Sequence, residues 1–316
     1  MNHIDLVNRS LVSVIIPTYK RATTLLDAIR SVLNQTYKNI EIVIVDDNGK
    51  GTYEQLETER LLKQYIENQQ IIYIVHEYNK NGSAARNTGL MASHGAYINF
   101  LDDDDKMYPQ KIEKQVQRLE FTDESIGATY CNSQITHYQN ITHKKIVKFS
   151  NIEKEGNLCI EYILGKARFN TSMIMFKRSA IEYIGGFDES YTRHQDYEMM
   201  IRFFRYFKIV CTAVEPLAIY DQTSDRINTP NCEKDFLMKQ KLMSDFSADF
   251  EKYRAKNDVA HYLWLRCAIN SALKKNPVYI EKSLTLCREY GKITLGEYLK
   301  LLRGRIVGYV KSLKHG

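Results

Sequence analysis

Two groups of carboxylates follow apolar runs of the sequence and could hold a divalent cation. Four consecutive aspartates at 102–105 end one run, and Asp46 and Asp47 end another. Adjacent carboxylates repel one another unless a cation neutralises them, and such oxygen ligands suit Mg²⁺ or Mn²⁺, with phosphates completing the shell. The alternative is a solvated acidic loop that caps the helix beginning at Pro109. The position of the aspartates after buried strands favours the metal site.

The segment 79–89 combines a turn, small residues and one cation, Arg86. A helix beginning here would direct backbone N–H groups toward an anion, and the guanidinium of Arg86 suits a base, a phosphate or a carboxylate. The alternative is a helix that needs Ala and Gly to approach a sheet closely, with Arg86 in an ordinary ion pair. The segment alone leaves both interpretations open.

A third group of candidate residues lies within 185–198. Gly185 and Gly186 permit close backbone approach or a positive φ. Asp196 opens a segment that is apolar on one side, so it could be a general base or the N-cap of a helix. Taken alone, such an aspartate is more often an N-cap, and His194 is more often a surface or core histidine than a metal ligand.

The elements that must position these residues alternate between strand and helix. Short apolar runs predict buried strands, and apolar residues at helical spacing predict amphipathic helices between them. This order predicts a parallel sheet with right-handed crossovers and helices on both faces. In such a sheet ligands bind beyond the carboxyl ends of the strands, where the aspartates fall. The predicted strands are 12–16, 40–45, 71–75 and 97–101, and the predicted helices are 23–34, 56–66, 83–93 and 109–121.

The rest of the chain is less regular. After residue 121 strands and helices are mixed, and beyond residue 231 the pattern is helical. This change predicts a boundary between 1–231 and 232–316. The predicted strands are 128–135, 146–149 and 171–176, and the predicted helices are 196–207, 236–250, 259–273 and 280–290.

The surplus of basic residues lies entirely in the helical region. The chain has 44 Lys and Arg against 38 Asp and Glu, and residues 232–316 hold 17 of the basic and 9 of the acidic side chains. A protein that binds nucleic acid would normally be basic over more of its length. We therefore expect no nucleic acid partner.

The sequence predicts neither a membrane span nor a disulfide framework. It has no run of 18 apolar residues, and its first residues lack the basic and apolar regions of a signal peptide. The six cysteines are scattered without a Cys-x-x-Cys pair, which is typical of reduced thiols. We expect a cytoplasmic protein.

Together the motifs resemble family 2 glycosyltransferases of the GT-A type, over roughly 11–225. The resemblance implies an α/β, Rossmann-like fold with a mostly parallel central sheet flanked by helices, which the C-terminal helical region predicted from the sequence pattern follows. It also implies nucleotide-sugar binding by about 11–121 and an acceptor side in about 122–231, within a catalytic domain 1–231. The motifs are VSVIIPTY (12–19), IVDD (44–47), NGSAARNTG (81–89), FLDDDD (100–105), and GGFDE (185–189) before QDYE (195–198).

The resemblance also implies roles for single residues. In this family one aspartate after the fourth strand holds the metal and another acts as general base. The chain departs from the family at one place, where Gln195 replaces a glutamate before the base. The implied roles are a nucleoside pocket at Pro17, Thr18 and Tyr19; uracil at Asp47 and Asp46; nucleotide at Arg86, Asp102 and Asp103; metal at Asp104 and Asp102; a base at Asp196; and acceptor or loop contacts at Gly186, Gln195 and Arg226.

These roles fit one reaction, a direct displacement at the anomeric carbon of a UDP-sugar that inverts its configuration. A base removes the proton of the acceptor hydroxyl, and Mn²⁺ or Mg²⁺ stabilises the leaving diphosphate. The Gln-x-x-Arg-Trp motif and membrane spans of processive members are absent, so we expect a hexosyltransferase that adds one sugar. The expected acceptor is a saccharide, lipid-linked, in bacterial capsule, lipopolysaccharide or exopolysaccharide synthesis.

Other functions were weighed on the same residues. A nucleotidyltransferase that makes nucleotide sugars carries a Gly-rich basic loop after its first strand, and residues 17–22 contain no glycine. A dinucleotide-dependent oxidoreductase would need Gly-x-Gly-x-x-Gly there. A degenerate, non-catalytic domain that binds membrane or a partner is disfavoured by the intact Asp102, Asp104 and Asp196. Whether the chain forms a homo-oligomer stays open.

The end of the chain predicts an amphipathic helix at 295–314. Its pattern fits a helix lying on an anionic membrane, which would place the protein peripherally at the inner face of the plasma membrane. It fits equally a helix that docks on the catalytic domain and shows water a basic face, and both interpretations stay open. The apolar residues are Leu295, Tyr298, Leu299, Leu302, Ile306 and Tyr309, and the basic ones are Lys300, Arg303, Arg305, Lys311 and Lys314, within a basic segment 292–316.

Overall fold

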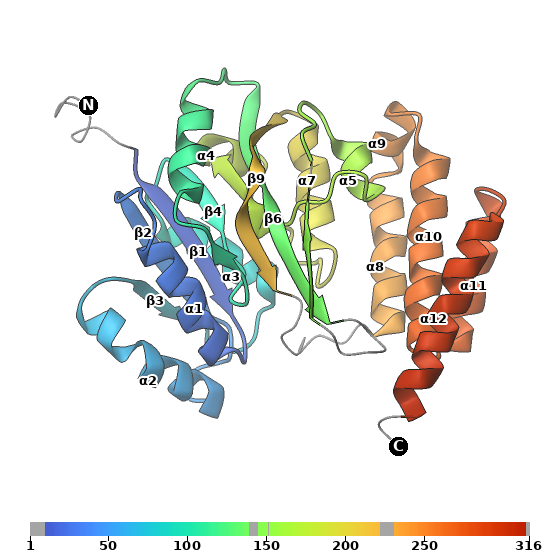
Figure 1. The fold of residues 1–316 in the computed structure, drawn as a ribbon, viewed down its shortest axis with the longest axis horizontal. Coiled ribbons are helices and arrows are strands. Elements are labelled where there is room, and N and C mark those ends of the chain that lie inside the picture. Colours follow the sequence, from blue (N-terminus) through green and yellow to red (C-terminus); the bar gives the residue numbers. More distant parts are fainter. Residues whose placement is uncertain (1–9, 139–144, 151, 222–230, 314–316) are drawn as a thin grey trace. The chain divides into compact units, whose positions relative to one another are not determined.

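The computed structural model describes residues 10–138, 145–150, 152–221 and 231–313 (Figure 1). The chain divides into two compact units. The sheet unit comprises Met1–His137, Lys145–Leu158 and Arg168–Asp225, and the helical unit comprises Tyr138–Lys144, Cys159–Ala167 and Arg226–Gly316. Each unit is described by itself.

The first half of the sheet unit is the expected parallel α/β arrangement. Its strands lie in the order β3-β2-β1-β4, and every neighbouring pair is parallel. The predicted boundaries agree with the observed ones to within a few residues. The elements are β1 (Val12–Thr18), α1 (Ala22–Leu33), β2 (Ile40–Asp46), α2 (Tyr53–Glu67), β3 (Ile72–Val75), α3 (Gly82–Ala92) and β4 (Tyr97–Phe100).

The second half makes the sheet mixed. The order continues β4-β8-β6-β9-β5, with β7 beside β6, and β8 is antiparallel to both of its neighbours. The expected strand at 171–176 is wrong in its first half, because residues 171–173 form a 3-10 turn. The elements are β5 (Lys106–Met107), α4 (Lys111–Glu120), β6 (Ile126–Tyr138), β7 (Lys145–Phe149), η1 (Thr171–Met173), β8 (Ile174–Lys177), α6 (Arg178–Tyr183), α7 (Gln195–Phe204) and β9 (Lys208–Asp221).

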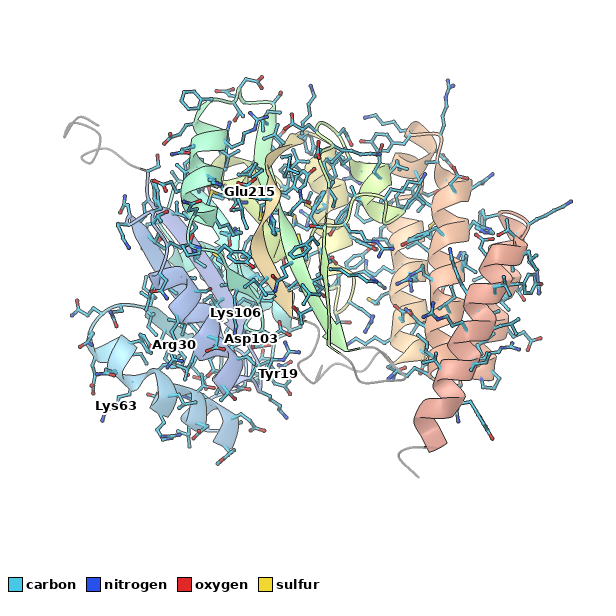
Figure 2. The ribbon with its side chains drawn as sticks, viewed as in Figure 1. Tyr19, Arg30, Lys63, Asp103, Lys106 and Glu215 are labelled. Atoms are coloured by element: carbon cyan, nitrogen blue, oxygen red, sulfur yellow. The ribbon has the colours of Figure 1, made fainter. Side chains whose placement is uncertain are left out.

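The two strands that the sequence did not indicate, β5 and β9, pair with each other at the end of the sheet. Each of the two strands forms an ion pair with a helix. Lys106 of β5 contacts Asp27 of α1 at 2.7 Å, and Glu215 of β9 contacts Lys114 of α4 (Figure 2). Such exposed pairs add little stability.

Both faces of the parallel half are covered. Helices α1 and α4 pack their apolar stripes on one face, in a core that includes Val14, Ile29 and Val116. Helix α3 lies on β1 through Gly89, where a Cβ atom would come 2.3 Å from the Cγ2 of Ile15. The small residues of α3 are therefore required for close approach to the sheet.

One buried cation lies in this core. Lys111 has no exposed surface, and its Nζ donates to Oε1 of Gln115 at 2.9 Å. Burial disfavours the charged ammonium and lowers the pKa of Lys111 from 10.5 to about 8. At pH 7 the folded state therefore bears the cost of a buried charge.

Lys111→Met is expected to raise the free energy of unfolding at pH 7 by about 1–2 kcal/mol. The gain is the relief of about 3 kcal/mol of pKa depression, less about 1 kcal/mol for the lost bond to Gln115. Below pH 8 Lys111 is protonated in both the folded and the unfolded state of the wild-type protein, so the full cost of burying its charge applies. It is relieved as the pH rises from 8 to 10.5, so the benefit of methionine should vanish near pH 10. Urea unfolding at both pH values tests this, and an equal benefit at both would contradict it.

The helical unit consists of helices packed around α10. Trp264 and Cys267 of α10 are buried with Cys287 of α11, and Ala272 of α10 packs with Leu301 of α12. The expected helix 236–250 breaks at Phe246. The elements are α5 (Cys159–Ile163), α8 (Cys232–Asp245), α9 (Ser247–Lys252), α10 (Lys256–Leu273), α11 (Pro277–Glu289) and α12 (Leu295–Leu313).

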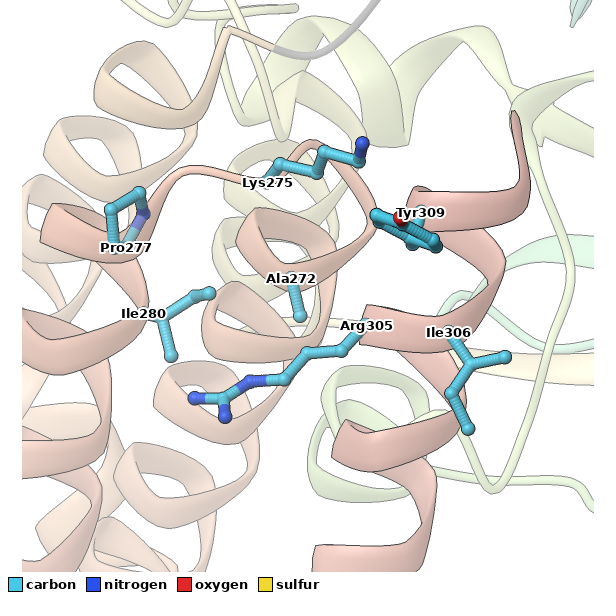
Figure 3. A pocket seen from close by; sticks show the side chains of 7 residues that line it. All are labelled: Ala272, Lys275, Pro277, Ile280, Arg305, Ile306 and Tyr309. Atoms are coloured by element: carbon cyan, nitrogen blue, oxygen red, sulfur yellow. The ribbon is translucent and has the colours of Figure 1, made fainter. Parts of the chain in front are cut away.

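An apolar hollow of about 670 Å³ lies within the helical unit, lined from α10, α11 and α12 and from the turn at Lys275 (Figure 3).

Over the described residues no helix has both the length and the apolar character needed to cross a membrane. All six cysteines are free thiols, as the sequence predicted.

Candidate active site

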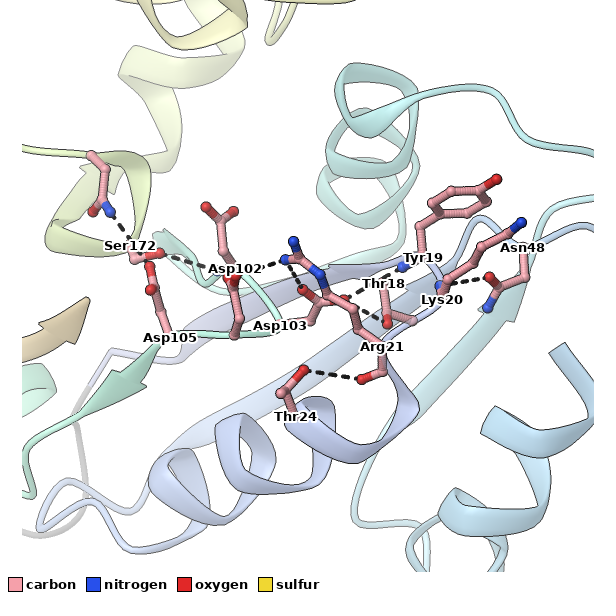
Figure 4. Close-up of polar contacts among 12 residues, drawn as sticks. Thr18, Tyr19, Lys20, Arg21, Thr24, Asn48, Asp102, Asp103, Asp105 and Ser172 are labelled. Atoms are coloured by element: carbon pink, nitrogen blue, oxygen red, sulfur yellow. Dashed lines mark hydrogen bonds and ion pairs between the residues drawn. The ribbon is translucent and has the colours of Figure 1, made fainter. Parts of the chain in front are cut away.

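The loops after β1 and β4 meet at the carboxyl edge of the sheet because these strands are parallel neighbours. Asp103, after β4, accepts hydrogen bonds from the Thr18 hydroxyl at 2.9 Å and from the backbone N–H of Tyr19 at 3.4 Å (Figure 4). Only 5% of Asp103 is exposed, and this burial raises its pKa to about 7 although Arg21 opposes the rise. The fold thus joins two motifs that the sequence separates.

The acidic run is neutralised by arginines from two other elements. Nη1 of Arg21 lies 2.7 Å from Asp104 and 3.2 Å from Asp103, and Nη2 of Arg86 lies 2.6 Å from Asp102. Arg21 was not singled out from the sequence, although it follows Tyr19 by two residues. Each aspartate predicted to hold the metal therefore faces a guanidinium in this structure.

Arg86 connects three parts of the site. Besides Asp102, its Nη1 donates to the carbonyl of Gly82 at 3.2 Å and to Oε1 of Gln195 at 3.3 Å. Its guanidinium lies 5.4 Å from the centroid of the Phe187 ring. Its Nε is buried and has no partner within the described part of the chain. The structure shows the close packing of α3 on the sheet and places Arg86 in an ion pair with Asp102. Binding of an anion by this segment stays a prediction.

The Gly-Gly-Phe turn is fixed to α3 by Asn87. Its side chain accepts from the N–H of Phe187 at 2.9 Å and donates to the carbonyl of the same residue at 2.8 Å. Gly186 has a φ of +67°, and a Cβ there would come 2.6 Å from Oδ1 of Asn87. The site therefore requires glycine at this position for both conformation and space.

A buried ion pair supports the same turn from α7. Arg202 donates to both carboxylate oxygens of Glu198, and its Nη2 donates to the carbonyl of Gly186 at 2.8 Å. Glu198 is 2% exposed. Neither residue was picked out from the sequence, although a Glu and an Arg four residues apart on an otherwise apolar helix is a detectable signal.

Asp196 lies in the first turn of α7 and is half-buried. The N-cap is His194, in the left-handed region at a φ of 59°, so the alternative role of Asp196 as N-cap is wrong. Because Gln195 contacts Arg86, the start of α7 is held beside the acidic run.

Asp46 and Asp47 are bound by protein groups. Asp46 is buried, accepts from the Tyr73 hydroxyl at 2.6 Å, and has its pKa raised by burial. The Asp47 carboxylate accepts four hydrogen bonds, at 2.7 to 3.0 Å, and so orders the loop before α3. The four donors are Nδ1 of His76, Nδ2 of Asn79 and the N–H groups of Lys80 and Asn81.

The other predicted residues lie at the end of β1 or outside the described residues. Pro17 belongs to β1 and Tyr19 follows it, both half-buried, and Lys20 has a φ of 57° and donates its N–H to Asn48 at 2.8 Å. Arg226 lies outside the described residues. The side chains brought together at one edge are therefore those after β1 and β4, Arg86 of α3, and Gln195 with its neighbour Asp196.

The acidic run offers two partly exposed carboxylates to a divalent cation. Within the described ranges no group of three or more His, Cys, Asp or Glu could form a complete metal site. Asp102 and Asp104 still present two carboxylates, with side-chain exposures of 31% and 12%. Mg²⁺ is usually held by one or two carboxylates together with substrate phosphates and water. The residues fit a cation that arrives with a nucleotide rather than one bound by protein alone.

A known protein family matches the part of the chain that forms this edge. The model of the family described as "Glycosyl transferase family 2" matches residues 13–185. The chain belongs to this family. The matched range covers β1 to α6, and therefore the acidic run and Arg86.

Two family members and one solved structure extend the comparison. "Amylovoran biosynthesis glycosyltransferase AmsB" of Erwinia amylovora is 32% identical over 213 residues, 66% of this chain and 68% of that protein. "UDP-Glc:alpha-D-GlcNAc-diphosphoundecaprenol beta-1,3-glucosyltransferase WfgD" of Escherichia coli is 29% identical over 179 residues, 55% and 68% of the two chains. The mannosyltransferase PcManGT of Pyrobaculum calidifontis, solved with GDP-Man and Mn²⁺, has a TM-score of 0.55 at 15% identity and covers 97% of this chain and 88% of its own. This likeness confirms the expected fold.

Proposed function

We propose that this family 2 glycosyltransferase transfers a single sugar from a UDP-sugar to a saccharide acceptor with inversion at the anomeric carbon. The observation that carries the proposal is the convergence of the Asp102–Asp104 carboxylates, Arg86 and the start of α7 on one sheet edge. A donor diphosphate bound there would have cations on one side and Asp196 toward the acceptor.

Asp196 is the proposed general base. It removes the proton from the acceptor hydroxyl as that oxygen attacks the anomeric carbon, and the bond to the leaving diphosphate breaks on the opposite side. Asp196 is only half-buried in the first turn of α7, so an acceptor hydroxyl can approach it. Gln195 holds this turn beside Arg86 at 3.3 Å.

Asp104 and Asp102 are the proposed ligands of Mn²⁺ or Mg²⁺. A bound cation would stabilise the negative charge that grows on the leaving diphosphate. In the free protein Arg21 and Arg86 form ion pairs with these carboxylates. A cation bound by the carboxylates would release both guanidinium groups, which could then bind the phosphates of the donor. The Mn²⁺ in the mannosyltransferase structure supports the use of a divalent cation.

The nucleoside is proposed to bind beside the loop after β1, against Pro17, Thr18 and Tyr19. Asp103 reaches this loop through Thr18 and is proposed to face the ribose. Asp46 and Asp47 stay candidates for the uracil contact. To hydrogen-bond the Asp47 carboxylate, the uracil ring would have to replace one of the four donors that already bind it.

The proposed acceptor is lipid-linked, and the proposed pathway is bacterial surface polysaccharide synthesis at the cytoplasmic face of the membrane. The name of WfgD specifies an acceptor on diphosphoundecaprenol, and that of AmsB specifies amylovoran biosynthesis. Gly186 and its turn, with Gln195, are the proposed acceptor side of the site.

Screening nucleotide sugars tests the function. Purified protein with Mn²⁺ is expected to release UDP from one or a few UDP-sugars, faster when a saccharide acceptor is added, and EDTA is expected to stop it. GDP-mannose belongs in the panel, because release of GDP alone would contradict the uridine donor. Formation of pyrophosphate from UTP and a sugar phosphate would indicate a nucleotidyltransferase instead. No release from any donor would contradict the transferase.

A further inference from the structure

Helix α12 has two apolar faces with different fates. One face packs on α10 and contains Leu301, Gly304, Val307 and Gly308, all buried. A Cβ at Gly308 would come 2.7 Å from the carbonyl oxygen of Leu273, so α12 touches the end of α10 through backbone. The packing of α12 on α10 therefore uses only this face of the helix and leaves the opposite face free of that contact.

The opposite face is an exposed apolar stripe. Its residues recur every three or four positions, so they line one side of the helix. They keep between 41% and 77% of their surface exposed, and they are Leu295, Tyr298, Leu299, Leu302, Ile306 and Tyr309. Single exposed apolar residues are ordinary, but a continuous stripe of six marks an interaction surface.

Cations flank this stripe on both sides. At 3.6 residues per turn, Arg303 and Arg305 project about 80° to either side of its midline, and both are exposed. The single acidic residue of α12, Glu297, lies at its first turn. There it accepts from the N–H of Thr294 at 2.8 Å and lies 3.3 Å from His261, away from the stripe.

The hollow of about 670 Å³ lies beside the stripe and carries two cations of its own (Figure 3). Ile306 and Tyr309 belong to both features, while Lys275 and Arg305 stand among the lining residues. Nζ of Lys275 lies 4.9 Å from the centroid of the Tyr309 ring. An apolar hollow with cations at its side suits an acyl chain whose phosphate stays at the surface.

We propose that the outward face of α12 binds the surface of an anionic phospholipid bilayer. The stripe enters the boundary between headgroups and acyl chains, while Arg303, Arg305 and Lys275 pair with lipid phosphates. The charges around the stripe favour an anionic bilayer as the partner. Cations lie along both edges of the stripe and it contains no acidic residue, so its surface is complementary to anionic headgroups. This surface would attach the protein to the membrane, and the proposal does not depend on which donor or acceptor the protein uses.

The test uses the full chain and vesicles of phosphatidylcholine alone or mixed with phosphatidylglycerol. Co-sedimentation is expected with the mixed vesicles only, weakening as salt is raised. Arg303→Glu with Arg305→Glu should weaken binding by about 30-fold or more. The control Arg30→Glu with Lys63→Glu makes the same charge change at two exposed cations of the sheet unit (Figure 2) and should weaken binding far less.

A second pair of variants tests the apolar stripe. Leu299 and Leu56 are matched, with 57% and 55% of their surface exposed. Leu299→Glu is expected to reduce vesicle binding at least about tenfold and Leu56→Glu hardly at all. Equal loss in both, or equal binding to neutral vesicles, would overturn the proposal.

Two further measurements separate the alternatives. Circular dichroism and UDP binding should be unchanged in every variant, because none of the substituted residues lies in the proposed site. If the protein ignores vesicles and sediments as a dimer that Leu299→Glu converts to a monomer, the stripe binds a second copy, and the membrane proposal is wrong.

Discussion

Replacing Asp196 with asparagine is expected to lower kcat by about 100- to 10,000-fold while leaving donor affinity nearly unchanged. Asparagine keeps the shape of the side chain and its place in the first turn of α7 but cannot accept the acceptor's proton. The loss should therefore appear in turnover with a saccharide acceptor, and not in calorimetric binding of UDP. Steady-state kinetics on the best donor of the screen measures it.

The control for this variant is Asp258→Asn. Asp258 also lies in the first turn of a helix, α10 of the helical unit. Both substitutions remove a similar interaction with a helix dipole, about 0.3–1 kcal/mol, but only one removes the proposed base. Normal turnover by Asp196→Asn, or an equal loss in both variants, would show that Asp196 is not the base.

Asp104→Ala is expected to abolish the gain in UDP affinity that Mn²⁺ provides. At the proposed site Asp104 would hold the cation, which would offset the charge of the diphosphate, so binding of UDP with Mn²⁺ is expected to be much tighter than binding in EDTA. The variant lacks this carboxylate and also leaves Arg21 without its 2.7 Å partner. Its affinity in EDTA should therefore be equal to or higher than that of wild type, which makes the result distinct from simple damage to the site.

Asp27→Ala is the matched control for a lost carboxylate. Asp27 pairs with Lys106 at the surface of α1 and has no role in the proposed site. Calorimetry with and without Mn²⁺ should give wild-type values for it. An unchanged Mn²⁺ effect in Asp104→Ala would remove Asp104 from the metal site.

Local patterns sufficed for the parallel half of the fold. Strands β1, β2 and β4 of that half are mostly buried apolar runs and helix α1 carries a regular apolar stripe, so their approximate boundaries follow from the pattern of apolar residues. The second half depends on distant pairing. Strand β9 contains Glu215 and Pro216 and pairs with β6 through register shifts, so it lacks the continuous apolar run that marks β1.

The site shows the same division between local and distant information. Sequence motifs pointed to the acidic run and to Arg86, and the structure brings these together. Arg21 was missed because nothing near it in sequence indicates a partner 82 residues away. Asp47 illustrates the opposite case, since its motif suggests a ligand contact while its carboxylate is filled by backbone and side-chain donors of the following loop.

The ion pair between Arg21 and Asp104 makes free metal a poor first ligand. A lone cation would have to displace a guanidinium already within hydrogen-bond distance, and the displaced arginine would gain nothing in exchange. A cation that enters with a nucleotide diphosphate supplies that arginine with new phosphate oxygens at the same moment. We therefore expect metal and donor to bind the proposed site as one unit, so that the metal content of the protein follows the supply of sugar nucleotide.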